Sequence, residues 1–170
     1  YSEEAFQIAL DYGLTILGTS DVHGLIDWDY PPSIGDHRPV TLVLAQDESN
    51  EAVKSALFDG RTVVWFKNNI IGLEKNIREL TDFYLSAKKV EVLEKSDIAK
   101  ITIENISDVR FIVQILNEVS LVNQSSLIEI APNTVTSIQV DGGASMDSID
   151  IQVLNAFIAP KKNLKTTISF

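Results

Sequence analysis

The 170-residue sequence is long enough for one large domain or two small ones, and its hydrophobic content of 45% is that of a protein with a packed core. Its formal charge is −10, from 24 acidic and 14 basic residues, and such a surface repels phosphate backbones, so no nonspecific binding of nucleic acid is expected. The lack of cysteine excludes disulfides and thiolate catalysis, and the lack of a run of about 18 consecutive apolar residues predicts no membrane span.

The opening residues, YSEEAFQIALDYG, predict an acidic amphipathic helix and not a signal peptide. Ser2 can cap this helix, and Glu3 and Glu4 lie in its first turn, where the helix dipole favours acidic side chains. Gly13 is a suitable residue to end it. Because the sequence starts inside such an element and without an initiator Met, we expect it to be a fragment of a longer protein.

Strand and helix patterns then alternate up to about residue 88. Short apolar runs predict buried strands at LTILG (14–18), VTLVLA (40–45) and RTVVWF (61–66). Apolar residues at helical spacing predict helices over 49–60 and from about Ile71 to Ala87. This order is typical of an α/β sheet or barrel with parallel strands, although three strands are too few to close a barrel.

After residue 89 the pattern changes to short runs with an alternation of two, separated by turn-forming residues. No helical pattern interrupts them, which indicates an antiparallel, immunoglobulin-like β-sandwich. We therefore predict an α/β domain over residues 1–88 and a sandwich over 89–170. The runs are VEVLE, AKITIENI, RFIVQIL, SLIEIA, TVTSIQV, IDIQVLNAFI and LKTTISF.

Asp21 and His23 follow the first predicted strand and are the candidate metal ligands. Two residues apart in an extended backbone, they would point the same way, and a carboxylate with an imidazole suits Zn, Mn or Fe. Gly18 and Gly24 would allow the backbone to approach a crowded centre closely. The spacing alone, however, favours an ordinary turn, because Asp often caps a turn after a strand and a single His in a loop is usually solvated.

The motif TSDVHG, preceded by a helix and an apolar strand, resembles the last metal-binding motif of the PHP (polymerase and histidinol phosphatase) family. The stretches HRPVTLVLAQDES and EAVKSALFDGRTVVWFKN are similar to the C-terminal part of PHP-type phosphoesterases, so the resemblance covers roughly residues 1–85. It implies a distorted seven-stranded β/α barrel that binds two or three divalent metal ions and hydrolyses phosphate esters.

On this resemblance, Asp21 and His23 become metal ligands. The family's early His-x-His pair has no counterpart, and the only other histidine is His37. A hydrolytic metal needs about three protein ligands and a water molecule. We therefore expect the chain alone to be inactive and its metal site to be empty, unless another segment completes the cluster.

The insert LIDWDYPPSIGDHRP, directly after the motif, is expected to form a loop at the mouth of the site. Arg38 could clamp a phosphate with two hydrogen bonds, with help from His37, or it could instead pair with Asp27, Asp29 or Asp36 and only shape the loop.

Lys67 follows the third predicted strand and could meet an anionic substrate, although a solvated lysine before a helix is the commoner case. Trp65 is assigned to the core. In the sandwich, Asn105 and Asp108, and the group Asp141, Asp147 and Asp150, fit no calcium loop and are expected to be solvated turns.

Two hypotheses follow. In the first, the chain is the C-terminal part of a PHP-like phosphoesterase, either a phosphodiesterase or a small phosphomonoesterase, that hydrolyses a small phosphate ester with a metal-activated water molecule. In the second, the chain is noncatalytic and the sandwich carries a binding function. A second copy could cover the exposed sheet edge. The compartment stays open, although accessory sandwiches are frequent on exported bacterial enzymes, which favours a periplasmic or exported protein.

Overall fold

The chain folds into a mixed α/β region followed by an antiparallel β-sandwich, as predicted. The computed structural model describes residues 1–170 except 32, 34–36 and 94–95. It divides into two compact units, of which the first comprises Tyr1–Ile77 and Ala156–Lys162. The second comprises Arg78–Asn155 and Asn163–Phe170. None of the helices in the described residues is long and apolar enough to span a bilayer.

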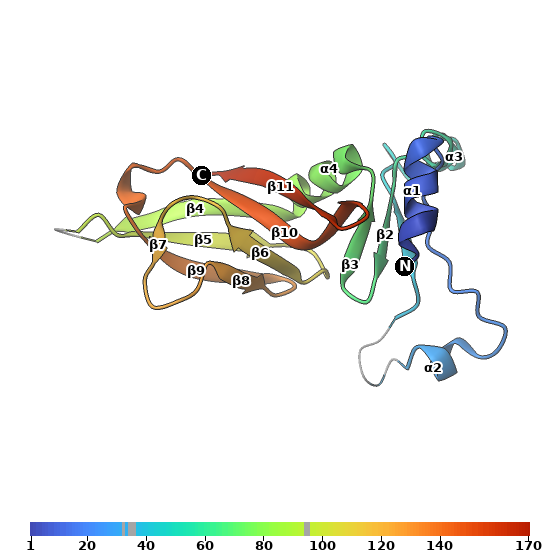
Figure 1. Cartoon of the computed structure of the whole chain (residues 1–170), viewed down its shortest axis with the longest axis horizontal. Coiled ribbons are helices and arrows are strands. Elements are labelled where there is room, and N and C mark those ends of the chain that lie inside the picture. Colours follow the sequence, from blue (N-terminus) through green and yellow to red (C-terminus); the bar gives the residue numbers. More distant parts are fainter. Residues whose placement is uncertain (32, 34–36, 94–95) are drawn as a thin grey trace. The chain divides into compact units, whose positions relative to one another are not determined.

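Two helices of the first unit begin at the residues that the sequence indicates. The hydroxyl oxygen of Ser2 accepts a hydrogen bond from the Ala5 N–H, and that of Ser49 accepts one from the Ala52 N–H, so each serine caps a helix. Figure 1 shows these helices, α1 and α3, in the first unit. The helical elements are α1 (Glu3–Asp11), α2 (Ile26–Asp29), α3 (Asn50–Phe58) and α4 (Glu74–Tyr84), the last of which continues into the second unit.

The sheet of the first unit contains β1 (Val40–Val43), β2 (Thr62–Phe66) and β3 (Asn69–Gly72). β1 pairs antiparallel with β2, and β2 pairs antiparallel with β3. The end of β10 (Ser148–Ala159) adds a short parallel pairing, with Ala156 and Phe157 opposite Ile70 and Ile71 of β3. The expectation of parallel strands is therefore wrong for both pairs that β2 makes. Between β2 and β3 the reason is a tight hairpin that reverses the chain.

Two predicted elements are placed differently. Residues 14–18 are extended but belong to no strand, and Leu14 and Leu17 are exposed, so the prediction of a buried strand there is wrong. The helix predicted from Ile71 to Ala87 is wrong at both ends, because Ile71 lies in β3 and β4 begins at Leu85. Apolar residues of β3 happen to continue the helical spacing of α4.

The core of the first unit packs α1 on the sheet. Phe6, Val64 and Ile71 are buried together, and partly buried apolar side chains that include Ile16 pack against them. Asn76, also buried, donates from its amide nitrogen to the carbonyls of Gly60 and Thr62, at 2.7 and 3.0 Å. These bonds fix the start of α4 against the start of β2.

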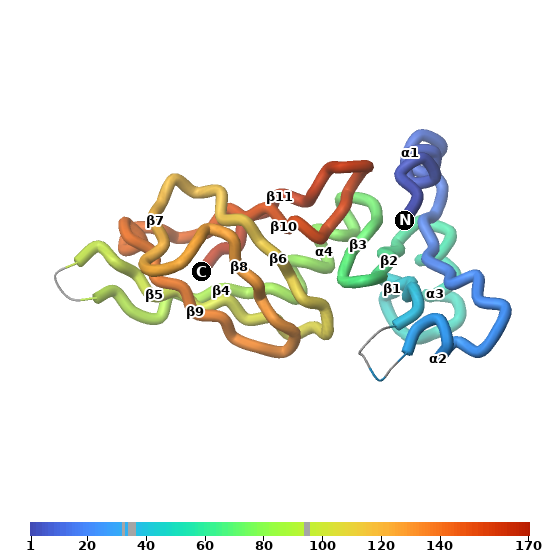
Figure 2. The backbone as a smooth tube through the Cα atoms, turned by 60° about the horizontal axis from the view of Figure 1, so that its bottom comes forward, coloured from blue at the N-terminus to red at the C-terminus, as the bar shows by residue number. Residues whose placement is uncertain are grey.

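The second unit contains two sheets, seen in Figure 2. One sheet has the strand order β4-β5-β9-β7; in the other, β10 pairs with β6 and β11, and β6 pairs with β8. Alternate residues of β5, β6 and β8 are buried, as a sandwich core requires. The elements not yet given are β4 (Leu85–Val92), β5 (Ala99–Asn105), β6 (Phe111–Ile115), β7 (Ser120–Leu121), β8 (Leu127–Ile130), β9 (Thr134–Asp141), η2 (Gly143–Ser145) and β11 (Lys162–Ser169).

All seven short runs of the sequence pattern fall on strands of the second unit, with β10 extending into the first unit. The two-residue strand β7 was not predicted. The division into domains at residue 88 stays a prediction.

Candidate functional site

Asp21 and His23 follow an extended segment, residues 14–19, that runs on from α1. Threonine side chains hold this segment to the sheet. The Thr62 hydroxyl donates to the Ile16 carbonyl at 2.7 Å. The Thr41 hydroxyl oxygen accepts from the Gly18 N–H at 2.9 Å, and the same hydroxyl lies 3.2 Å from the Gly18 carbonyl oxygen. The route of the chain toward Asp21 is therefore fixed by side-chain hydroxyls of β1 and β2.

Gly18 is required by packing on β2. A Cβ atom at this position would lie 2.5 Å from Cγ1 of Val64, closer than any real contact between such atoms. From the sequence, this glycine is expected to allow a close approach at a metal centre. The structure places the close approach at the Val64 side chain.

The backbone turns sharply at Asp21, which has a φ of 52°. This is the left-handed region, which Asp tolerates better than most residues. The expectation that Asp21 and His23 point the same way rested on an extended backbone, and that condition is not met at Asp21. Both side chains are exposed. Their role as metal ligands stays a prediction.

The donors present do not make a complete metal site. Within the described residues, no group of three or more His, Asp or Glu side chains could hold a metal ion. The donor types of Asp21 and His23 suit a divalent metal, but two donors are fewer than a hydrolytic metal needs. These residues alone therefore do not fit such a centre.

A polar pocket of about 430 Å³ lies at the end of the extended segment. Thr19, Ser20 and Arg38 line it, together with Gly18 and residues 39–41. In the part of the chain that the structure describes, Arg38 makes no ion pair with Asp27 or Asp29. Asp36, the third acid considered as a partner, lies outside the described residues. A guanidinium beside two hydroxyls is suitable for an anion.

His37 does not line this pocket, and its ring contacts β2. Its Nδ1–H donates to the Arg38 carbonyl at 2.7 Å, and its ring centroid lies 4.3 Å from that of the half-buried Trp65. Lys67 occupies the two-residue turn between β2 and β3 with a φ of 46°, and its Nζ lies 5.2 Å from the centre of the Phe66 ring. The expectation of a helix after Lys67 is therefore wrong, whereas the substrate-binding roles of both residues stay predictions.

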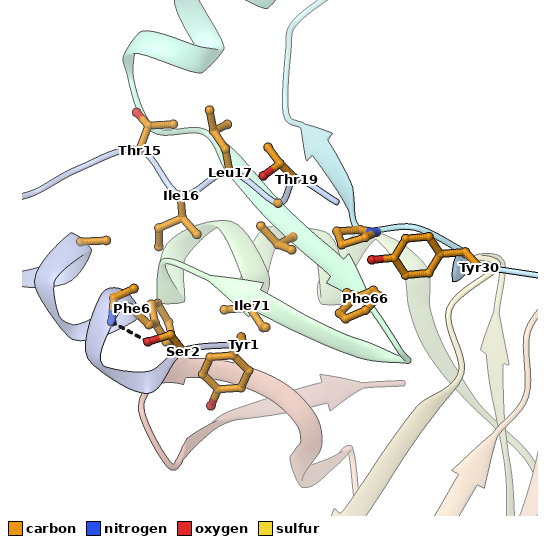
Figure 3. Close-up of a pocket in the computed structure, with 15 residues that line it drawn as sticks. Tyr1, Ser2, Phe6, Thr15, Ile16, Leu17, Thr19, Tyr30, Phe66 and Ile71 are labelled. Atoms are coloured by element: carbon orange, nitrogen blue, oxygen red, sulfur yellow. Dashed lines mark hydrogen bonds between the residues drawn. The ribbon is translucent and has the colours of Figure 1, made fainter. Parts of the chain in front are cut away.

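A second cavity, of about 460 Å³, is apolar and was not predicted. It lies between α1, residues 15–19 and the β2–β3 hairpin, and Tyr1, Tyr30 and Phe66 extend its wall (Figure 3). The exposed Leu17 lines this cavity. The one sequence signal for the cavity was the apolar run of residues 14–18, for which no partner strand could be identified.

The second unit has a cavity of about 460 Å³ that was not predicted, lined by Arg78, Leu116, Asp150, Lys165, Thr166 and Thr167. Asn105 is 1% exposed, so the expectation of a solvated turn is wrong for this residue. Asp108 accepts a hydrogen bond from Asn133, and Asp150 accepts one of 2.6 Å from the Thr167 hydroxyl. These carboxylates fix turns and strand ends.

The chain was compared with proteins of known family and structure. Residues 85–169 match the Ig-like domain family DUF5001. The chain is also similar to a crystal structure from Bacteroides vulgatus, that of a two-domain protein containing a predicted PHP-like metal-dependent phosphoesterase. The identity is 30% and the TM-score 0.86, over 100% of this chain and 50% of the solved one, so the chain spans half of that protein's length. No curated protein matches the chain.

Proposed function

The chain belongs to the Ig-like domain family DUF5001, and from this and its structural likeness we propose that it forms part of a metal-dependent phosphoesterase of the PHP type. The observation that carries the proposal is the likeness itself. It extends over the whole chain, the first unit included, in a protein predicted to be such an enzyme. A likeness confined to the Ig-like half would support a sandwich and nothing more.

Asp21 and His23 would supply two donors to a metal cluster that residues outside this chain complete. This division agrees with the absence of a three-donor group among the described residues and with the shared length of one half. The turn at Asp21 is held from one side by the bonds of Gly18 to Thr41, so the two donors would be presented by a fixed backbone.

Arg38 would bind the phosphate of a small phosphate ester in the polar pocket. The pocket lies directly before Asp21 in the chain, since Thr19 and Ser20 line it. The guanidinium can donate two hydrogen bonds to phosphate oxygens, and the hydroxyls can donate one each. Among the described residues, Arg38 pairs with neither Asp27 nor Asp29, which supports this role over a loop-shaping pair with either of those two acids.

The test uses the natural polypeptide that contains residues 1–170. Hydrolysis of p-nitrophenyl phosphate and bis(p-nitrophenyl) phosphate is measured with Mn²⁺ or Zn²⁺ and with chelator. We expect metal-dependent turnover that Asp21→Asn and His23→Gln each reduce by about a hundredfold or more, together with bound metal. Turnover that is the same in Asp21→Asn as in the unchanged protein would contradict the assignment.

Arg38→Met tests the anion site separately. We expect KM to rise by about tenfold or more, because a charge-assisted hydrogen bond contributes about 1.5–3 kcal/mol. Arg110→Met is the matched control, since Arg110 lies in the second unit, where it pairs with Glu129. A KM that rises equally in both variants would assign the effect to net charge and not to the pocket.

The second candidate is a noncatalytic chain in which the sandwich binds a partner. The match of residues 85–169 to an Ig-like family supports it, and the incomplete donor set among the described residues favours it over an enzyme. A natural polypeptide that binds no metal and hydrolyses neither ester would favour this candidate.

A further inference from the structure

The cavity of the second unit is formed by one helix and two neighbouring strands. Figure 1 shows the two strands, β10 and β11, side by side. Asp21, His23 and Arg38 belong to the first unit, so this cavity is separate from the candidate metal and phosphate sites. Its lining consists of Arg78 from α4, Asp150 from β10, Lys165, Thr166 and Thr167 from β11, and Leu116, which follows β6.

Hydrogen bonds hold this lining in place. Arg78 donates from Nη1 to the Thr166 hydroxyl at 3.1 Å and from Nη2 to the Lys165 carbonyl at 3.0 Å. Thr166 is 8% exposed, so this contact lies inside the protein. The Thr167 hydroxyl donates to the Asp150 carboxylate at 2.6 Å. A lining that is already ordered lowers the cost of binding a ligand.

Two opposite charges face this cavity without neutralising each other. Lys165 and Asp150 both line it, and in the described part of the chain neither of them makes an ion pair. Their attraction is therefore available to a ligand that contacts both. The volume of about 460 Å³ lies in the range of roughly 300–1,000 Å³ that is usual for small-molecule sites.

The charges of the lining select the kind of ligand. Arg78 and Lys165 are cationic and Asp150 is anionic, so this surface has a positive excess on a chain whose formal charge is −10. A ligand with one negative charge complements that excess. Asp150 would repel a bare anion, however, so the ligand must present a hydrogen-bond donor to this carboxylate, as a hydroxyl group does.

Leu116 adds an apolar surface to the cavity. Its side chain is 38% exposed, and it lies beside Asp150, since its N–H donates to the Asp150 carbonyl at 2.8 Å. The C–H groups of a ring can pack on such a side chain. Acetate and glycine are too small to contact this surface and the charged groups together.

We propose that this cavity binds a hydroxylated carboxylate of the sugar-acid class. Lys165 and Arg78 bind the carboxylate of the ligand, Asp150 accepts a hydrogen bond from a ring hydroxyl, and Leu116 contacts the C–H face of the ring. An amino acid also brings a donor to Asp150, but its ammonium group cancels the negative charge that the lining favours. The inference does not rest on the proposed function.

The test measures binding to the natural polypeptide that contains residues 1–170, by saturation-transfer NMR titration with four ligands. Glucuronate is the probe. Glucose keeps the ring but lacks the charge, acetate keeps the charge but lacks hydroxyls, and glycine replaces the hydroxyls with an ammonium group. We expect glucuronate to bind about tenfold or more tightly than each of the others, because hydrogen bonds to charged groups are the stronger ones. No binding of glucuronate, or equal or tighter binding of any other ligand, would overturn the proposal.

Two variants locate the ligand. Lys165→Met should weaken the binding of glucuronate by about tenfold or more, because it removes a charge-assisted hydrogen bond. Asp150→Asn can still accept from Thr167, and it should weaken glucuronate but not acetate, because it removes the charge that repels a bare anion. Lys88→Met is the matched control, since Lys88 is exposed on β4 and does not line the cavity. Glucuronate binding that is unchanged in Lys165→Met, or weakened equally in Lys88→Met, would contradict this site.

The outcome is independent of activity. Binding of glucuronate by a polypeptide that hydrolyses no phosphate ester would support this site and contradict the proposed function. Metal-dependent hydrolysis by a polypeptide that does not bind glucuronate would do the reverse.

Discussion

Removal of the Asn105 side chain should destabilise the second unit more than any other single amide change in its turns. The side chain is 1% exposed and lies at the end of β5. Its Nδ2 donates to the carbonyls of Val109 and Ala131, at 2.7 and 3.0 Å. Its Oδ1 accepts from the N–H and the hydroxyl of Ser107, at 3.0 and 2.7 Å. One residue thus joins the turn after β5 to the end of β8.

The magnitude follows from these bonds. A buried hydrogen bond contributes about 1 kcal/mol net, and an orphaned buried partner costs about 1–3 kcal/mol. The two carbonyls are not wholly orphaned in Asn105→Ala, because the Thr134 hydroxyl still donates to Ala131 at 2.8 Å and that of Ser107 lies 3.4 Å from the Val109 oxygen. We therefore expect a loss of about 3 kcal/mol, a large share of the roughly 5–15 kcal/mol of a typical domain.

The assay is urea unfolding followed by far-UV circular dichroism, which reports on the strands of the sandwich. Gln139→Ala is the control, since Gln139 is exposed on β9 and should cost no more than about 0.5 kcal/mol. Equal midpoints for the two variants would refute the reasoning, because the network would then contribute no stability.

Asn105→Asp sharpens the test without a change of shape. At neutral pH its carboxylate would face two carbonyl oxygens in a buried site, so burial and repulsion would raise the pKa of the new carboxyl above its unfolded value. The penalty is absent below the unfolded pKa of about 3.9 and grows as the pH rises above it. The variant should therefore approach the stability of the unchanged chain near pH 3.5 and fall furthest below it near pH 7.

Three further predictions concern the first unit. Gly18→Ala should cost about 1–3 kcal/mol in thermal unfolding, because its Cβ would overlap Val64; an unchanged Tm would refute this. The side chain and backbone N–H of Ser49 hold the pKa of Asp47 below its usual value of 3.8. Ser49→Ala should raise that pKa in an NMR titration, and an unmoved titration would contradict the cause. Lys67→Val should destabilise the hairpin by about 1 kcal/mol or more and Lys67→Asn should not, because a β-branched residue tolerates a φ of 46° poorly.

The sandwich was predictable because apolar and polar residues alternate along its strands. Burial alternates residue by residue along β5 and β6, so apolar and polar positions mark strand and face together. The serine caps of α1 and α3 were also local, and the structure confirms both. The buried role of Asn105 was not predictable from the sequence, because the fold determines its partners Val109 and Ala131.

The errors at β3 and at the start of α4 share a physical cause. The β2–β3 turn, Lys67–Asn68, lacks the glycine that usually marks a two-residue hairpin, and both of its residues adopt a positive φ. Without that signal, the apolar residues after it continued the helical spacing of α4. The direction of the chain after β2 was therefore predicted wrongly, and with it the pairing of β2 with β3.

The candidate site was predictable in its residues but not in its geometry. The motif around Asp21 and His23 is readable from the sequence, whereas the left-handed turn at Asp21 is a property of the folded backbone. The pocket at Arg38 joins residues 18–20 to residues 38–41, which are distant in sequence. The periodicity of the sequence contains no information on such pairs.

The extended segment shows why a correct local reading produced a wrong element. Residues 14–18 have the composition of a buried strand, and their backbone is extended as such a strand requires. They form no backbone hydrogen-bond ladder with another strand. Instead, the hydroxyls of Thr62 and Thr41 bind Ile16 and Gly18 on one edge, where a backbone partner would otherwise lie. Side-chain hydroxyls can fix the register of a segment, but they bury little apolar surface. The composition of the segment therefore did not predict its lack of a partner strand, and Leu17 stays 55% exposed.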